Sequence, residues 1–451
     1  MLKKRAASFW LTAMFYTMLQ RVSLFIFGVT AYMILVRGFS TETNGVWALY
    51  VTIYSLFEGV KQGLLRNSSI KFLSVAEYAG KRNAVQSSSL VINIMFSVLV
   101  IALVFASGKL ISKWLHAPAL LPLLFISTLI IVLLIPFNHC EILLQSKFRF
   151  DVLFTSAFIR QGVFFAGLVI LYFFYRAYFT LANVLLLQVL GLAVAVVYIV
   201  KRTSSNLIRK FTYERGLTKR LFHFGKYTFG TNLFAGLSRS FDHFITANTL
   251  NTPVGRDYVA YYNTVARINN MVDVPSLAAA DVLYPKNVEA HEKAGMEKVK
   301  YYFEQIIGTI LVFIIPLSLL IFIFPKPVIF VIAGPRYYPA IFILHLTILF
   351  SVVRPLSYQF GSTLDAIGKP HINFWANALL MVTNLLLTYM FIRTYGAIGA
   401  AYGSMVYYTL SFVVMLLILK KFIRIELRNI LGYGLSRYRD LYNYVKMSFS
   451  S

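Results

Sequence analysis

The stretch ALLPLLFISTLIIVLLIPFNHCEILLQSKFRFD, residues 119–151, contains both features that decide the fold of this chain. Its first part, residues 119–140, is an apolar run long enough to cross a membrane as an α-helix, which needs about 20 residues. A short polar segment that carries Lys147 and Arg149 follows. Because lipid offers no partner for backbone N–H and C=O groups, apolar runs of this length are predicted to be helices.

The same succession of apolar run and short polar segment repeats along the chain. A β-barrel would need short segments of alternating polarity instead. With 58% hydrophobic and 13% charged residues among 451, nearly all the mass is expected in the bilayer, and no gap is long enough for a soluble catalytic domain. About twelve membrane spans are predicted, at residues 9–36, 46–65, 88–106, 119–140, 153–175, 179–200, 222–248, 256–284, 301–324, 340–363, 372–392 and 396–419.

Lys and Arg residues gather in every second polar segment. Of 43 basic residues, 28 lie in one class of segment, which includes the N-terminus, residues 201–221 and the region after residue 420, and 8 lie in the other class. Cytoplasmic loops of membrane proteins carry the excess of positive charge. Both termini are therefore predicted to be cytoplasmic. The net charge of +26 is assigned to loops that face anionic headgroups, and no nucleic-acid partner is expected.

The basic segment at 201–221 divides the chain into two predicted halves, 1–200 and 222–420, which a basic amphipathic cytoplasmic tail at 421–451 follows. Polar turns after the first and seventh runs resemble each other, as in a weak internal repeat. Six runs return the chain to the same side of the membrane, so the halves would share one topology. Transporters built from such repeats bind substrate between the halves. The predicted fold is an all-α membrane protein of about twelve transmembrane helices, in two six-helix bundles around a central cavity.

Motifs across the seventh and eighth runs resemble those of a known family. Residues 239–245, Arg-Ser-Phe-Asp-His-Phe-Ile, are similar to its Arg/Leu-Asp-x-x-x-Ile segment. Residues 258–267 resemble its Gly-x-Tyr-x-x-Ala-x-Arg stretch, and residues 282–285 its Leu-Phe-Pro ending. The turn before the eighth run departs from the pattern, because Arg256-Asp257 stands where the family has Leu-Gly. On these motifs, the chain resembles the polysaccharide transporter (oligosaccharide flippase, Wzx-like) family of the multidrug/oligosaccharidyl-lipid/polysaccharide exporter superfamily.

The resemblance implies a flippase that moves a polyprenyl-diphosphate-linked oligosaccharide unit across the bacterial inner membrane by alternating access. Such a flippase would serve O-antigen, capsule or exopolysaccharide synthesis. Its implied partners are the lipid-linked oligosaccharide and the membrane, and contact with the polysaccharide polymerase machinery is left open. No cofactor is implied beyond coupling to H⁺ or Na⁺.

Three other classes of protein stay open at this stage. A multidrug cation antiporter of the same superfamily would need a cavity with net negative charge. A membrane enzyme of polysaccharide assembly would be expected to carry a sizeable outer loop, and no predicted outer segment exceeds about fifteen residues. A membrane scaffold without transport activity would have no reason to place seven basic residues inside predicted spans.

Those seven basic residues are candidates for the substrate site, because a charge within a span is costly unless it faces a cavity or a partner. The planar fork of Arg suits a diphosphate, since it donates two parallel hydrogen bonds to oxygen atoms. Four of the seven are predicted to bind diphosphate: Arg21, Lys61, Arg239 and Arg267. The other three have structural alternatives. Lys226 lies near a cytoplasmic end, Arg354 precedes Pro355 and can cap broken backbone, and Arg160 is the only charge on its run.

Carboxylates inside the predicted spans are candidates for a site that binds H⁺ or Na⁺, namely Asp242, Asp273 and Asp281. A structural alternative stands beside each. Asp242 lies three residues after Arg239 on one helix face, where the two can pair, and Asp273 and Asp281 can neutralise nearby Arg residues. Glu58 and Lys61 share the same three-residue spacing.

The sequence shows no His/Cys cluster with metal-ligand spacing, no P-loop and no nucleophile elbow. No catalytic residue and no metal ligand are therefore predicted, and the chain is not expected to be an enzyme. Small residues at Gly399 and Gly403 are predicted to let two helices pack closely.

Overall fold

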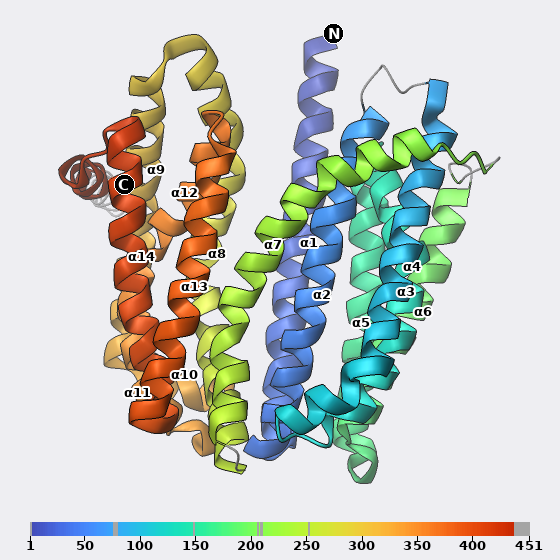
Figure 1. Cartoon of the computed structure of the whole chain (residues 1–451), viewed down its shortest axis with the longest axis vertical. Coiled ribbons are helices and arrows are strands. Elements are labelled where there is room, and N and C mark those ends of the chain that lie inside the picture. The colour runs from blue at the N-terminus through green and yellow to red at the C-terminus, as the bar shows by residue number, and fades with distance from the viewer. Residues whose placement is uncertain are drawn as a thin grey trace, which may run out of the picture. The chain divides into compact units, whose positions relative to one another are not determined.

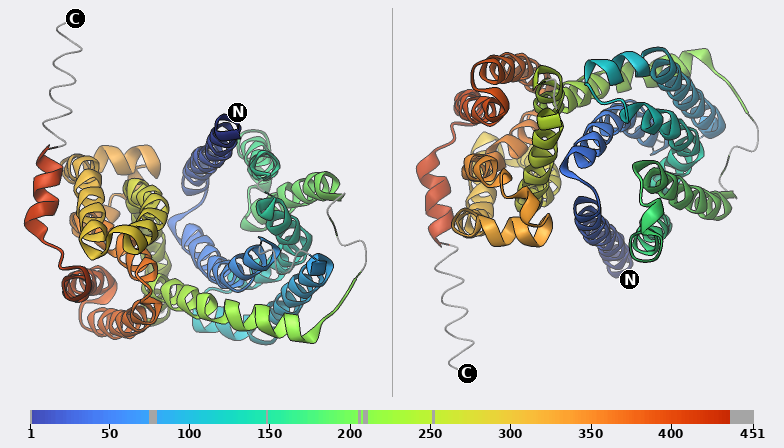
Figure 2. Two further views of the ribbon diagram at one scale, coloured as in Figure 1. Left: turned by 90° about the horizontal axis from the view of Figure 1, so that it is seen from above. Right: turned by 90° about the horizontal axis from the view of Figure 1, so that it is seen from below.

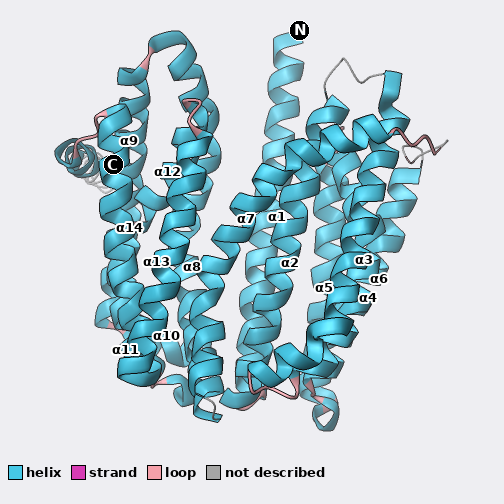
Figure 3. Cartoon of the chain, viewed as in Figure 1, coloured by secondary structure: helices cyan, strands magenta, loops and turns pink. Residues whose placement is uncertain are grey.

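The described part of the molecule is helical throughout. The computed structural model describes residues 2–74, 80–147, 149–204, 207, 211–250 and 253–436, and these contain helices joined by short loops and turns, with no strand (Figures 1 and 3). The prediction of an all-α chain is confirmed. The predicted segments 201–221 and 421–451 are described only in part, because residues 205–206, 208–210 and 437–451 lie outside the described residues.

The chain divides into two compact units. The first contains Met1–Gly236 and Asn251–Arg256, and the second contains Leu237–Leu250 and Asp257–Ser451. Helix α7 (Arg215–Leu250) therefore begins in the first unit and ends in the second. The predicted division into halves at 1–200 and 222–420 is not tested by these two units and stays a prediction.

Helix α4 is central among the helices of the first unit, because it contacts α2, α3, α5 and α6. Helix α1 contacts α5 and α2. Each of these helices is connected to the next by a loop of only a few described residues, so consecutive helices are neighbours. Helices α1–α6 cover Leu2–Gly38, Thr41–Ser74, Arg82–Trp114, Leu120–Ser146, Phe150–Phe174 and Leu181–Thr203.

The second unit contains shorter helices as well as long ones, because proline and glycine interrupt the chain. Pro325, Pro355 and Pro370 lie in the first turns of α10, α12 and α13, where a helix does not need their missing N–H. Gly295 separates α8 from α9 with a φ of 74°, which few other residues adopt without strain. Helices α8–α14 cover Pro253–Ala294, Met296–Ile323, Pro325–Ile332, Ala340–Ile348, Arg354–Ala366, Pro370–Tyr395 and Gly399–Ile423.

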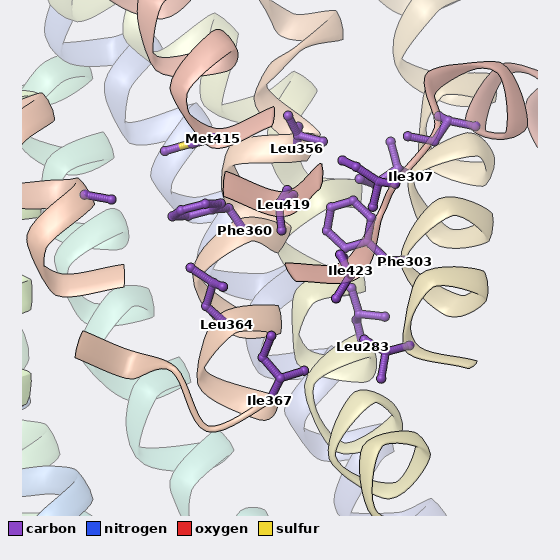
Figure 4. Packing of buried hydrophobic residues seen from close by; sticks show 14 of the residues in the cluster. Leu283, Phe303, Ile307, Leu356, Phe360, Leu364, Ile367, Met415, Leu419 and Ile423 are labelled. Carbon is purple, nitrogen blue, oxygen red and sulfur yellow. The ribbon is translucent and has the colours of Figure 1, made fainter. Parts of the chain in front are cut away.

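The core of the second unit joins α9, α12 and α14. Phe303, Phe360, Leu364 and Leu419 are buried together there (Figure 4). Within a bilayer, lipid tails are as apolar as these side chains, so van der Waals packing rather than the hydrophobic effect drives such association. Close fit between the helices therefore matters more here than apolarity alone.

Eight described helices are long and apolar enough to cross a membrane: parts of α1 and α13 and all of α3, α4, α5, α6, α9 and α14. A bent pair, Ala340–Val352 and Arg354–Ala366, makes a ninth if it crosses as one span with a bend of 46°. The other predicted spans lie in α2, α7 and α8, which have 34, 36 and 42 residues but are more polar. The chain thus has the helices of a multi-pass membrane protein, and the number of twelve spans stays a prediction.

Helices α13 and α14 approach each other closely at Gly399. A Cβ atom built there would overlap the backbone carbonyl group of Phe391. Gly403 continues the contact, since its Cβ would lie 3.0 Å from the Cα atom of Thr388. These positions explain why small residues follow a four-residue spacing at the start of α14.

Substituting Gly399 by Ala is expected to destabilise the protein by about 1–3 kcal/mol, because the added methyl group forces the two backbones apart. Gly28→Ala is the matched control, since no atom lies within 4 Å of a Cβ built at Gly28. Thermal unfolding of the purified variants in detergent measures the difference. Equal melting temperatures for the two variants would contradict this account of the α13–α14 contact.

Candidate functional site

Helix α2 presents charged and polar side chains to the interior of the first unit. Glu58, Lys61, Gln62 and Arg66 follow at helical spacing and share one side of the helix. Lys61 is only 5% exposed, and its Nζ atom donates a hydrogen bond of 3.0 Å to Ser97 Oγ on α3. A buried ammonium group on a membrane helix needs such a partner.

Two small cavities flank Lys61. Aromatic side chains line the first, including Tyr50, Tyr54 and Phe57, together with Ser97 of α3. The second is polar, and its lining comes from α2 and α4: Lys61, Gln62, Arg66, Asn138, Glu141 and Gln145, with Leu65 and Ile142. Lys61 therefore stands between an aromatic cavity and a polar one.

Side chains of α4 and α5 complete a cluster around α2. Arg66 Nε donates to Gln145 Oε1 at 2.9 Å, and Gln62 Nε2 donates to Glu58 Oε1 at 3.4 Å. The guanidinium group of Arg160 on α5 interacts electrostatically with Glu58, Glu141 and Tyr54. It also lies 5.8 Å from the ring centroid of Phe137.

These contacts bring five charged side chains of α2, α4 and α5 together. We call Glu58, Lys61, Arg66, Glu141 and Arg160 the α2 charge cluster.

The α2 charge cluster was missed by sequence reasoning as a unit. Lys61 is among the residues predicted to bind diphosphate, whereas Arg160 is one of the other basic candidates and the only charge on its run. The signal available beforehand was the three-residue spacing of Glu58 and Lys61. Nothing in the sequence indicated that α5 would bring Arg160 to the same place, because residues 58 and 160 are joined only by the tertiary fold.

A second cluster lies in the second unit, around Asp273 of α8. Its side chain is 2% exposed, and its Oδ1 atom forms an ion pair of 3.2 Å with Nε of Arg354, at the start of α12. The hydroxyl group of Tyr358 donates to Asp273 Oδ2 at 3.1 Å. Arg354 Nη2 in turn donates to Asn269 Oδ1 at 3.4 Å. Asp273, a predicted ion-coupling residue, is thus paired with the cation Arg354. This is the alternative in which Asp273 neutralises a nearby Arg residue.

Of the remaining predicted residues, the structure describes the side chains of two. Arg21 is exposed on α1 in the first unit, and Arg267 is half-buried on α8 in the second. The side chains of Arg239, Asp242 and Asp281 lie outside the described part of the structure. The predicted roles of these residues stay predictions, and so does the substrate cavity predicted between the two halves.

Among the residues that the structure describes, no group of three or more His, Cys, Asp or Glu side chains is placed to hold a metal ion. His139 is buried, and neither of its ring nitrogens has a hydrogen-bond partner. Cys140 is buried beside it as a free thiol. The described geometry instead offers charged and hydrogen-bonding groups inside membrane helices, which can hold a polar or anionic ligand.

Comparison with known families gives a match over both units. Residues 34–342, more than half of the chain, match the family described as "Polysaccharide biosynthesis protein". This stretch includes both clusters except for Arg354 and Tyr358 of the second.

Three relatives are similar in sequence. An uncharacterized membrane protein of Methanocaldococcus jannaschii is 25% identical over 59% of this chain and 53% of its own length. A probable low-salt glycan biosynthesis flippase of Haloferax volcanii is 19% identical over 52% of this chain and 48% of its own length. The chain thus spans about half the length of these two relatives. A putative O-antigen transporter of Shigella flexneri is 23% identical over 81% of this chain and 87% of its own length.

Two solved structures share the fold. A multidrug resistance MATE family transporter of the MOP superfamily, in an inward-facing conformation, has a TM-score of 0.76 and 15% identity over 91% of this chain and 98% of its own. The lipid II flippase MurJ, in an inward closed conformation, has a TM-score of 0.75 and 16% identity over 96% of this chain and 93% of its own. At these identities the likeness shows the fold, and each alignment covers more than nine-tenths of this chain.

Proposed function

Because the chain belongs to the polysaccharide biosynthesis protein family, we propose that it is a transporter that flips a lipid-linked oligosaccharide across the bacterial inner membrane. Family membership over residues 34–342 is the observation that carries this proposal, and it confirms the resemblance found in the motifs. Two sequence relatives support it, since they are named as a glycan biosynthesis flippase and an O-antigen transporter. These names are those of transporters rather than of enzymes.

The substrate we propose is an oligosaccharide on a polyprenyl diphosphate. A diphosphate cannot cross hydrocarbon without compensating charge, so a flippase for it needs cations within its membrane helices. Arg21, Arg239, Arg267 and Lys61 would supply hydrogen bonds to the diphosphate oxygens, while the lipid tail stays in the bilayer. We propose alternating access of the two halves to the two leaflets, and both termini on the cytoplasmic side.

Energy for the movement would come from a gradient of H⁺ or Na⁺, with Asp242, Asp273 and Asp281 as the proposed coupling residues. The ion pair between Asp273 and Arg354 gives this proposal a physical form. Binding of a cation to Asp273 would weaken its hold on Arg354. The product on the outer leaflet would then pass to polysaccharide polymerase machinery.

A multidrug cation antiporter is the second candidate, because a MATE family transporter shares the fold. The charges in the first unit favour an anionic ligand instead. The α2 charge cluster contains three cations, Lys61, Arg66 and Arg160, and two carboxylates, Glu58 and Glu141. Together with the family match, this balance favours the glycan flippase.

A transport assay separates the two functions. Purified protein in sealed vesicles is expected to move a fluorescent polyprenyl-diphosphate oligosaccharide between leaflets, which an external glycosidase or quencher detects. Empty vesicles supply the background. Efflux of a cationic dye from the same vesicles tests the antiporter. Dye efflux without movement of the lipid-linked sugar would overturn the proposal.

A further inference from the structure

The chain continues beyond α14 into a short helix that crosses the bundle of the second unit. Helix α14 ends at Ile423, and Arg424 turns the chain with a left-handed φ of 50°. Residues 427–436 are helical. This helix is seen end-on in Figure 1, where α9 and α14 are seen from the side, and it lies along the plane of Figure 2, where those helices are seen end-on. We call residues 427–436 the crossing helix.

A buried carboxylate of α9 holds the start of the crossing helix. Glu304 is 1% exposed, although it lies on a helix apolar enough to span a membrane. Its Oε1 atom accepts the backbone N–H of Glu426 at 2.8 Å, and its Oε2 atom accepts Asn429 Nδ2 at 3.1 Å. A carboxylate at the N-terminal end of a helix accepts an otherwise unpaired N–H group, and its negative charge interacts favourably with the positive end of the helix dipole.

Close packing fixes the rest of the crossing helix on α9. A Cβ atom at Gly308 would lie 2.6 Å from the carbonyl oxygen of Ile430 and 3.0 Å from the backbone nitrogen of Gly434. The rings of Tyr301 and Tyr433 meet edge to face at 5.8 Å. The crossing helix therefore has a defined orientation, with Ile430 and Gly434 turned toward α9.

The orientation leaves a row of leucines uncovered. Leu427, Leu431 and Leu435 follow at four-residue spacing on one side, and they are 39%, 58% and 69% exposed. The next side of the helix carries Arg428 and Ser436, which are also exposed. The helix thus has three sides: one against α9, one of leucines and one polar.

The occupant that fits the leucine side is the lipid bilayer. The crossing helix lies across helices that are built to span a membrane, so it can lie in the plane of the bilayer surface. Exposed Lys420, Lys421, Arg424 and Arg428 surround its start and complement anionic headgroups. Apolar side chains are exposed on α14 as well, at Leu410, Val413 and Leu417.

We propose that the crossing helix is an interfacial anchor, with Leu427, Leu431 and Leu435 inserted at the boundary between headgroups and acyl chains of an anionic leaflet. Helices with a leucine side and flanking cations bind membranes in this way. The anchor holds the cytoplasmic end predicted for α9 and α14 at a fixed depth. This proposal does not depend on which substrate is transported.

Spin labels can measure the depth of the crossing helix in the full-length protein. Leu431→Cys and Leu435→Cys are labelled with a nitroxide, with Ser436→Cys on the polar side as the matched control. Unsubstituted protein gives the blank, since its one cysteine, Cys140, is buried. The proteins are reconstituted in vesicles of phosphatidylethanolamine and phosphatidylglycerol, and collisions with oxygen and with a water-soluble nickel chelate are compared.

Labels at positions 431 and 435 are expected to collide severalfold more with oxygen than with nickel, and the label at 436 is expected to show the reverse. In vesicles of phosphatidylcholine alone, the preference for oxygen at 431 should fall. Preference for nickel at 431 and 435 would overturn the proposal, because the leucines would then face water. Protection from both reagents would overturn it too, because protein, such as a second copy of the chain, would then cover the leucines. An unchanged preference in neutral vesicles would refute the role of the cations.

Discussion

Replacing Arg267 by Ala is expected to abolish export of the glycan while the amount of protein in the membrane stays the same. The reason is that the proposed diphosphate would depend on bidentate guanidinium contacts, which Ala cannot make. Arg21→Ala is expected to act in the same way. Lys at either position should restore export only in part, because an ammonium group lacks the planar fork.

This result is measured in cells that depend on the protein for surface polysaccharide. Surface glycan is compared with membrane levels of the protein for each variant. Arg336→Ala is the matched control, since Arg336 is exposed in the short segment before α11 and lies in the sparsely charged class of loop. If both Arg21→Ala and Arg267→Ala export normally, the diphosphate site lies elsewhere and these arginines have structural roles.

Breaking the ion pair between Asp273 and Arg354 is expected to destabilise the protein by about 3–5 kcal/mol, because either change leaves a buried charge without its partner. Arg354→Met and Asp273→Asn make the two single variants. The double variant should lose less than the sum of the two, since both charges are then absent. Unfolding in mixed detergent, followed by fluorescence, measures all three. Lys81→Met supplies the control, because its pair with Glu214 is exposed and such pairs contribute about 0–1 kcal/mol.

The same variants test coupling. Asp273→Asn protein that remains folded but no longer transports against a gradient would support the proposed ion site at Asp273. Strictly additive losses in the single and double variants would contradict the pairing, and normal transport by folded Asp273→Asn protein would remove Asp273 from the coupling residues.

The helices could be predicted from the sequence where one physical signal decided them. The length and apolarity of the runs in α3, α4 and α9 are sufficient by themselves. Helices α2 and α8 were harder, because they carry polar side chains that are satisfied only by other helices. The bend after α11 follows from Pro355, but its angle is set by packing and could not be derived.

The clusters could be predicted only where local spacing reveals them. Glu58 and Lys61 lie one helical turn apart, so the sequence shows their proximity. Arg354 is 81 positions after Asp273, and Glu426 is 122 positions after Glu304. Contacts over such separations depend on how helices pack, and one sequence without relatives contains no signal for them. Glu304 could be recognised as a carboxylate in an apolar run, but its donors could not.

The separation between Glu304 and its donors has a consequence for biogenesis. Ribosomes make α9 more than a hundred residues before Glu426 and Asn429 emerge. During that interval the acid inside α9 lacks both donors, so the helix cannot reach its final packing until residues 426–429 are made. A message with a premature stop codon after Ile423 would therefore produce a protein with every predicted span but without the two donors that Glu426 and Asn429 supply to Glu304. The crossing helix is thus needed to satisfy a buried acid of α9, although it lies after all of the predicted spans.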